Sequence, residues 1–301
     1  MNSRSELSVV TSYETLFSIR RLWIILAASM AVMFGTLLYF GAQIYQAAPP
    51  IPAAVRSAGG QMLFTRADIE RGQNVWQSMG GMQQGSIWGH GSYVAPDWSA
   101  DWLHREATAL LELFAGSENA ASYASLAAPE QARLKAMLAQ TMRTNTYDAA
   151  TQLVTVSDDR ARAIASVAQH YSDLFQGGSA AAHALREQYA FPMDAVLTAD
   201  ESAALNAFFF WTAWAAGTQR PGESITYTSN WPHEPLIGNT PTGAVFMWTF
   251  ISIFVLLAGI GALVWYYAKE FDIWRRDGEP ETGFARRDFM SMIAVTPSMR
   301  A

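Results

Sequence analysis

Two long apolar runs without a charged residue stand out along the chain, at residues 22–44 and 244–268. At about 1.5 Å of rise per residue, a helix of either length spans the roughly 30 Å hydrocarbon core of a bilayer. Aromatic residues lie near the ends of both runs, as is typical of the membrane–water interface. The pattern therefore predicts two transmembrane helices.

The first run could instead be a secretory signal, because Arg20 and Arg21 precede it. It is longer than the roughly 7–15 apolar residues of a signal, and no small-residue cleavage site follows it. A membrane anchor is therefore favoured.

Basic residues near the two runs predict the orientation. Arginines precede the first run, and Lys269 with several arginines follows the second, whereas the segment between them has 11 Lys and Arg against 18 Asp and Glu, a net charge of −7. Basic flanks stay on the cytoplasmic side. We therefore expect cytoplasmic segments at 1–21 and 269–301, and a periplasmic domain at 45–243 of a bacterial inner-membrane protein.

The pattern within 45–243 is mainly helical. Thr65 and Asp68 are spaced as a capping box, and Ile69, Gly72 and Trp76 then fall on one helical face. A glycine on such a face favours close approach by another helix. Helix-start signals or apolar spacing predict further helices at 99–115, 129–143 and 157–175.

Two stretches depart from this pattern. TQLVTV is the only strand-like run, and the prolines of AAPPIPAAV predict a flexible, extended linker after the first span. The domain is therefore expected to contain little sheet.

The last helix of the domain begins at a second capping box, Thr198 to Glu201, and contains the run FFFWTAWAA at 208–216. A third membrane span is the alternative, but the apolar stretch is too short for it. A buried core helix is favoured. The loop that follows, TYTSNWPHEPLIGNTPTG, is expected to be ordered and to lie at the membrane surface.

The composition excludes several kinds of covalent link and metal site. Only 15% of residues are charged, against roughly 25% in an average soluble domain, in keeping with two membrane spans. There is no cysteine, which excludes disulfides, thiolate metal sites and haem attached through thioether bonds. The acidic domain gives no reason to expect nucleic acid.

The titratable residues give no catalytic pattern. None of the five histidines has another three or four residues away, and the carboxylates are expected on solvated helical faces or at helix N-termini. No catalytic residue is predicted in this chain.

Two stretches nevertheless carry a resemblance. GQNVWQSMGGMQQGSIWGHGSYVAPDWSADWLHRE and FFFWTAWAAGTQRPGESITYTSNWPHEPLIGNTPTG resemble the N-terminal region of quinol-dependent nitric oxide reductases, and TPSMRA resembles the lead-in to the family's next membrane helix. The resemblance implies a mainly α fold: two transmembrane helices flanking a cytochrome-c-like domain without haem.

The same resemblance implies that this domain lacks the haem of its relatives. In cytochrome-c-dependent relatives this segment carries two haem cysteines and a haem histidine, which align with Gly81, Gln84 and Gly85 here. Without haem the vacated space must be filled, and Met, Trp and Phe side chains suit that role.

The resemblance also implies contacts with the rest of the enzyme. A calcium ion bridges the two parts in the relatives, and its ligands align with Gly91 and Tyr93; a glycine turn with a packed tyrosine is the alternative. Asn230, Trp231 and Glu234 are expected to cover the catalytic domain.

The implied parent reaction is the reduction of two NO to N2O by a membrane quinol. Two b-type haems and a non-haem iron would lie in the family's catalytic membrane domain, which resembles haem-copper oxidases, and this chain alone is expected to hold no cofactor. Its expected partners are that domain, membrane lipid and, through that domain, quinol. The sequence is compatible with a homodimer. A stand-alone assembly subunit and a two-helix sensor remain open as alternatives.

Overall fold

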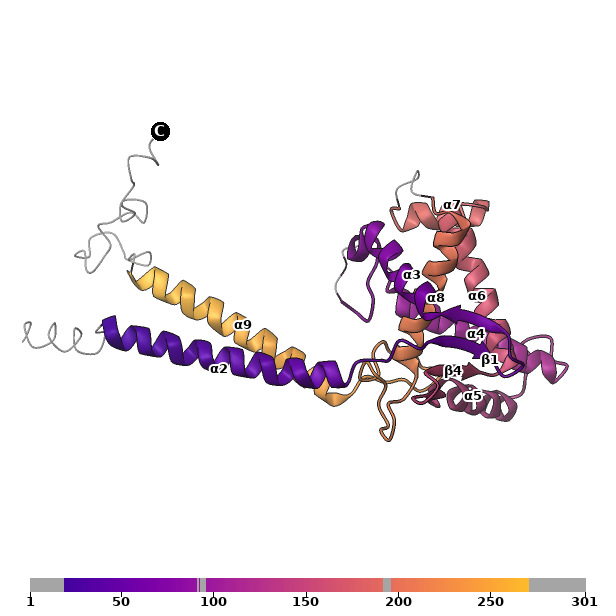
Figure 1. Cartoon of the computed structure of the whole chain (residues 1–301), viewed down its shortest axis with the longest axis horizontal. Helices are drawn as coiled ribbons and strands as arrows, with labels where there is room; N and C mark the ends of the chain where they lie inside the picture. The colour runs from indigo at the N-terminus through magenta and orange to yellow at the C-terminus, as the bar shows by residue number, and fades with distance from the viewer. Residues whose placement is uncertain (1–18, 91, 93–95, 192–195, 271–301) are drawn as a thin grey trace, which may run out of the picture. The chain divides into compact units, whose positions relative to one another are not determined.

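A computed structural model describes residues 19–90, 92, 96–191 and 196–270. The chain divides into two compact units, Met1–Thr240 and Pro241–Ala301. The first contains helix α2 (Ile19–Gln46) and the helical domain, and the second contains helix α9 (Gly243–Glu270) (Figure 1).

Both flanking helices are long and apolar enough to cross a membrane. The candidate spans are Trp23–Gln46 and Gly243–Trp265, and neither is buried by the protein itself. Because large apolar surfaces are rarely left in water, the two helices indicate a membrane protein. The predicted spans at 22–44 and 244–268 are confirmed as helices.

The domain contains a small sheet whose strands lie in the order β2-β1-β4-β3. Its strands are β1 (Ala54–Ser57), β2 (Met62–Thr65), β3 (Tyr147–Asp148) and β4 (Leu153–Val156). β1 pairs antiparallel with β2 and parallel with β4, and β3 pairs antiparallel with β4.

Two sequence predictions are wrong at this sheet. TQLVTV supplies β4 but is not the only strand, and the linker predicted as flexible ends in a strand whose Ala54 and Val55 are buried. The partner of β1 comes from almost a hundred residues later in the chain, so no local pattern reveals the pairing.

The rest of the domain, as far as the structure describes it, is built from helices. They are α3 (Arg66–Ser78), α4 (Trp98–Ser117), α5 (Ala128–Arg143), α6 (Asp158–Gln176), α7 (Ala180–Gln188) and α8 (Ala199–Gly217), with short 3-10 turns η1 (Gly81–Gln84) and η2 (Tyr123–Ser125) between them. The helices predicted at 99–115, 129–143 and 157–175 are confirmed as α4, α5 and α6, whereas the sequence pattern does not predict α7.

Helix α8 forms the centre of the core. Helices α3, α4, α5 and α6 all contact it (Figure 1). Phe209, Phe210 and Trp214 on it are at most 1% exposed. The predicted capping box is present, with the Thr198 side chain accepting from the Glu201 N–H and the Glu201 carboxylate accepting from the Thr198 N–H. The run at 208–216 is therefore a core helix of the domain.

Gly72 sets the contact between α3 and α8. A Cβ at this position would lie 2.0 Å from the carbonyl oxygen of Ala204 and 2.7 Å from Cβ of Phe208. Only a glycine permits this approach, as the sequence pattern predicts. The Thr65–Asp68 capping box that starts α3 is also present.

Candidate functional site

The segment that aligns with a haem-attachment motif is a closed loop between α3 and α4. Asp97 joins its two ends: Oδ2 accepts from the Ser86 hydroxyl at 2.8 Å and from the Gly89 N–H at 2.6 Å, while Oδ1 accepts from the Ala100 N–H at 3.0 Å and caps α4. Asp97 therefore fixes the loop against the start of α4.

Trp98 fills the inner side of this loop. Its indole N–H donates to the carbonyl of Gln84 at 3.0 Å, and the side chain is buried. Gly85 has φ +128°, and a Cβ there would lie 2.4 Å from Nε1 of Trp98 and 2.6 Å from the carbonyl oxygen of Pro96. The loop can take this shape only with glycine at residue 85.

An aromatic cluster continues behind Trp98. Its indole stacks on Phe209 with ring centroids 5.2 Å apart and 12° between the planes. Its other aromatic neighbours come from α6 and from the region after α7: Tyr171, Phe175, Tyr189 and Phe191. Tryptophan, phenylalanine and tyrosine therefore fill this region, while Met82 of the loop is half exposed.

The second segment of interest is the loop that follows α8, and Asn239 organises it. This buried amide donates to the carbonyls of Ala216 at 3.1 Å and Pro232 at 2.8 Å, and its oxygen accepts from Arg143 at 2.8 Å. The backbones of Asn239 and Glu234 exchange two hydrogen bonds of 2.9 Å.

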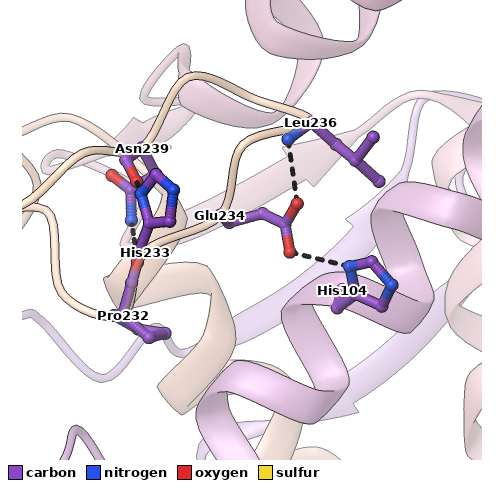
Figure 2. A network of polar contacts seen from close by, with 6 residues as sticks. All are labelled: His104, Pro232, His233, Glu234, Leu236 and Asn239. Carbon is purple, nitrogen blue, oxygen red and sulfur yellow. Dashed lines mark hydrogen bonds and ion pairs between the residues drawn. The ribbon is translucent and has the colours of Figure 1, made fainter.

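Figure 2 shows how the same loop is joined to α4. Oε2 of Glu234 lies 2.9 Å from Nδ1 of His104, and Oε1 accepts from the N–H of Leu236 at 2.9 Å. The Glu234 side chain is 4% exposed and that of His104 is 60% exposed. His233 lies beside Asn239, with its Nδ1 3.1 Å from the Asn239 carbonyl oxygen.

The three residues predicted to cover a catalytic domain differ in what they leave accessible. The oxygen of the Asn230 side chain accepts from the Thr226 N–H at 2.9 Å, and Glu234 is the buried partner of His104. Trp231 is 38% exposed, with its indole edge against Gly89. Trp231 is therefore the member of this set whose side chain is available to a partner.

Two carboxylates, Glu234 and Glu106, contradict the expectation of solvated faces. Glu106 is fully buried, 2.6 Å from Nε of Arg160, and it accepts from the indole N–H of Trp102 at 3.0 Å. An isolated buried charge is costly, so the pair holds α4 and α6 together. Asp158 is a helix-start charge as predicted, and its carboxylate accepts from the Gly59 N–H at 2.8 Å.

A comparison with protein families identifies the domain that contains these two loops. The family model of the nitric oxide reductase NorB cytochrome c-like domain matches residues 52–233, which is more than half of the chain. The chain belongs to this family. With an apolar helix on each side of the matched domain, it corresponds to the N-terminal region of the NorB polypeptide of nitric oxide reductase. A search of curated proteins found no match.

The cytochrome c-like domain of this nitric oxide reductase chain does not fit a covalent haem. The chain has no cysteine at all, and Gly81 and Gln84 stand where the resemblance places the two thiols. An imidazole on residue 85 would collide with the indole of Trp98. Among the described residues, no three His, Asp or Glu side chains converge as metal ligands.

Gly91 and Tyr93, the residues that the nitric oxide reductase resemblance assigns to calcium, lie outside the described residues. The nearby residue Asp97 is described; its Oδ2 accepts a hydrogen bond within the loop, and its Oδ1 accepts one from the first turn of α4. The calcium contact stays a prediction.

Proposed function

We propose that this chain is the anchoring and capping portion of a quinol-dependent nitric oxide reductase. The parent reaction would be 2 NO + quinol → N2O + H2O + quinone, performed by a catalytic membrane domain that carries two b-type haems and a non-haem iron. One observation supports the proposal most. In the loop that aligns with the haem-attachment motif, Trp98 occupies the space beside Gly85 that a haem-ligating histidine would need, and the chain has no cysteine.

The proposed electron donor follows from the route by which electrons can reach the catalytic domain. A cytochrome c is water-soluble and needs a haem relay outside the membrane to pass electrons inward. A domain that cannot hold this haem cannot serve as the relay. A quinol is lipid-soluble and delivers its electrons and protons within the bilayer, so the domain would be retained for its packing role.

The loop after α8 would then be the surface that meets the catalytic domain. Internal hydrogen bonds hold it in one conformation, which lowers the entropic cost of docking. Trp231 is its accessible aromatic side chain, and tryptophan is enriched among residues that dominate interface energies. Asn230 and Glu234 would act by fixing the loop.

The proposed location is the bacterial inner membrane, with the domain in the periplasm and both termini in the cytoplasm. Because the chain has no native cysteine, single cysteines can report this orientation. Ala53→Cys is expected to react with a membrane-impermeant maleimide in intact spheroplasts, and Ser298→Cys only after lysis. The reverse pattern would overturn the orientation.

The attachment to a catalytic domain is tested by tagging the N-terminus of this gene in its own host. A membrane band more than twice the 33.1 kDa of this chain, or a separate haem-containing subunit that co-purifies with it, is expected. A product of 33.1 kDa with no such partner would contradict the proposal and favour a stand-alone structural subunit or a two-helix sensor.

A further inference from the structure

A partly open cavity of about 380 Å³ lies where α2 passes into the domain. This volume is within the about 300–1,000 Å³ typical of small-molecule sites. Ile44 and Ala47 contribute to an apolar wall, and Arg220 and Tyr227 bring polar groups from the loop after α8. The lining is thus apolar on one side and cationic on the other.

The position of the cavity in the chain identifies its surroundings. Ile44 belongs to the first candidate span, Trp23–Gln46, and Ala47 follows directly after that span. A cavity built at this level borders the zone where hydrocarbon gives way to lipid headgroups. Trp88, another lining residue, is of the aromatic type that is enriched in this zone.

Arg220 supplies the charge. One terminal nitrogen donates to the Tyr227 carbonyl at 3.0 Å, the other lies 3.9 Å from the Glu223 carboxylate, and Nε is buried without a hydrogen-bond partner among the described residues. A ligand would instead meet the two terminal nitrogens, which carry four N–H groups; among the described residues the Tyr227 carbonyl accepts one of them, so donors remain for an acceptor in the cavity. The planar guanidinium fork is suited to phosphate oxygens.

The lining residue Trp88 is held in place by the core. The indole N–H of Trp88 donates to the carbonyl of Thr212 at 2.8 Å, and its ring lies 5.4 Å from that of Trp211. Trp211 in turn donates to the carbonyl of Pro50 at 3.0 Å, which fixes the segment after the span against α8. The part of the cavity wall formed by Trp88 is therefore fixed to the core.

Tyr227 is fixed on the polar side. Its hydroxyl accepts from the amide of Asn145 at 3.0 Å, and its ring lies 5.6 Å from that of Trp214. Because Tyr227 also accepts the Arg220 guanidinium through its carbonyl, the cation is oriented before any ligand arrives.

We propose that this cavity binds one membrane phospholipid, with its phosphodiester accepted by Arg220 and its glycerol and upper acyl segments against Ile44 and Ala47. The bound lipid would join the end of the first span to the loop after α8. The inference does not depend on which electron donor the enzyme uses.

The test uses the full chain in a phosphate-free maltoside detergent and native mass spectrometry. Dihexanoylphosphatidylglycerol is titrated against wild type, Ala47→Trp, which fills the cavity, and Ala53→Trp, a control with an exposed side chain in the same connecting segment. Wild type and Ala53→Trp are expected to bind one lipid with equal affinity, and Ala47→Trp at least about tenfold more weakly. Equal binding by Ala47→Trp would overturn the proposal.

A second variant and three other ligands test the phosphate contact. Arg220→Gln should weaken binding by about tenfold or more, since losing a hydrogen bond to a charged group has at least that effect. Ala47→Trp keeps the Arg220 contacts, so it remains informative if Arg220→Gln does not fold. Dihexanoylglycerol binding as tightly as the phospholipid would refute the phosphate contact. Equal binding of inorganic phosphate, or displacement of lipid by a short-chain quinol, would assign the cavity to another ligand and overturn the proposal.

Discussion

Restoring a histidine at residue 85 should disrupt the core. A Cβ there would lie 2.4 Å from Nε1 of Trp98, whereas non-bonded heavy atoms pack favourably at about 3.5–4.0 Å. The indole would have to move by about 1 Å or more, lose its hydrogen bond to Gln84 and leave its stacked position on Phe209. Loss of a core aromatic costs about 3–5 kcal/mol, a large part of the stability of a typical domain.

Gly85→His also forces a side chain onto a backbone with positive φ, so a matched control is needed. Gly60 has φ +90° and no atom within 4 Å of an added Cβ. Gly60→His therefore carries the backbone strain, about 1–3 kcal/mol, without the collision. The difference between the two variants reports the collisions at residue 85, with the Trp98 indole and with the Pro96 carbonyl.

Thermal unfolding of the full chain in detergent, followed by circular dichroism, measures this difference. At about 2–4 °C per kcal/mol for a domain of this size, Gly85→His should melt about 6–20 °C below Gly60→His. A difference of less than about 2 °C would show that Trp98 can make room for an imidazole. The loop around Gly85 would then no longer exclude a haem-ligating histidine.

Three further predictions use the same melting assay. Gly72→Ala should lower stability by about 1–3 kcal/mol, because its methyl group overpacks the helix contact, while Gly116→Ala, in open space, should be neutral or slightly stabilising; equal effects would refute the contact. Glu106→Gln should cost about 3–5 kcal/mol by leaving Arg160 buried without its anion, and a cost below about 1 kcal/mol would contradict the pairing. Burial, with a smaller contribution from Arg105, lowers the pKa of His170, so the unfolded chain binds this proton more readily and stability should fall as the pH drops below about 6.5. His170→Asn should reduce that fall, and an unchanged pH profile would refute it.

Local signals predicted the helices well. The capping boxes at Thr65 and Thr198 and the lengths of the two apolar runs are encoded within a few turns of chain, and each produced the expected element. Gly72 on an apolar face gave the close helix contact because the pattern that places it there is also local.

Features built from distant residues were missed. β1 pairs with β4 from almost a hundred residues away, and Glu106 is buried because Arg160 reaches it from another helix. The resemblance aligns the haem histidine with Gly85. Whether a histidine would fit there depends on where Trp98 packs, and residue spacing does not reveal that. The fixed loop around Asn239 likewise depends on Arg143 from α5.

We propose that this domain passes no electrons and that quinol supplies them within the membrane. The most direct test is to purify the enzyme from native membranes through a tag on this chain and to measure NO consumption with a soluble quinol and with reduced cytochrome c. Turnover with quinol alone is expected, with no haem-stained band for this chain after denaturing electrophoresis. Turnover driven by cytochrome c, or covalent haem on the chain, would contradict it.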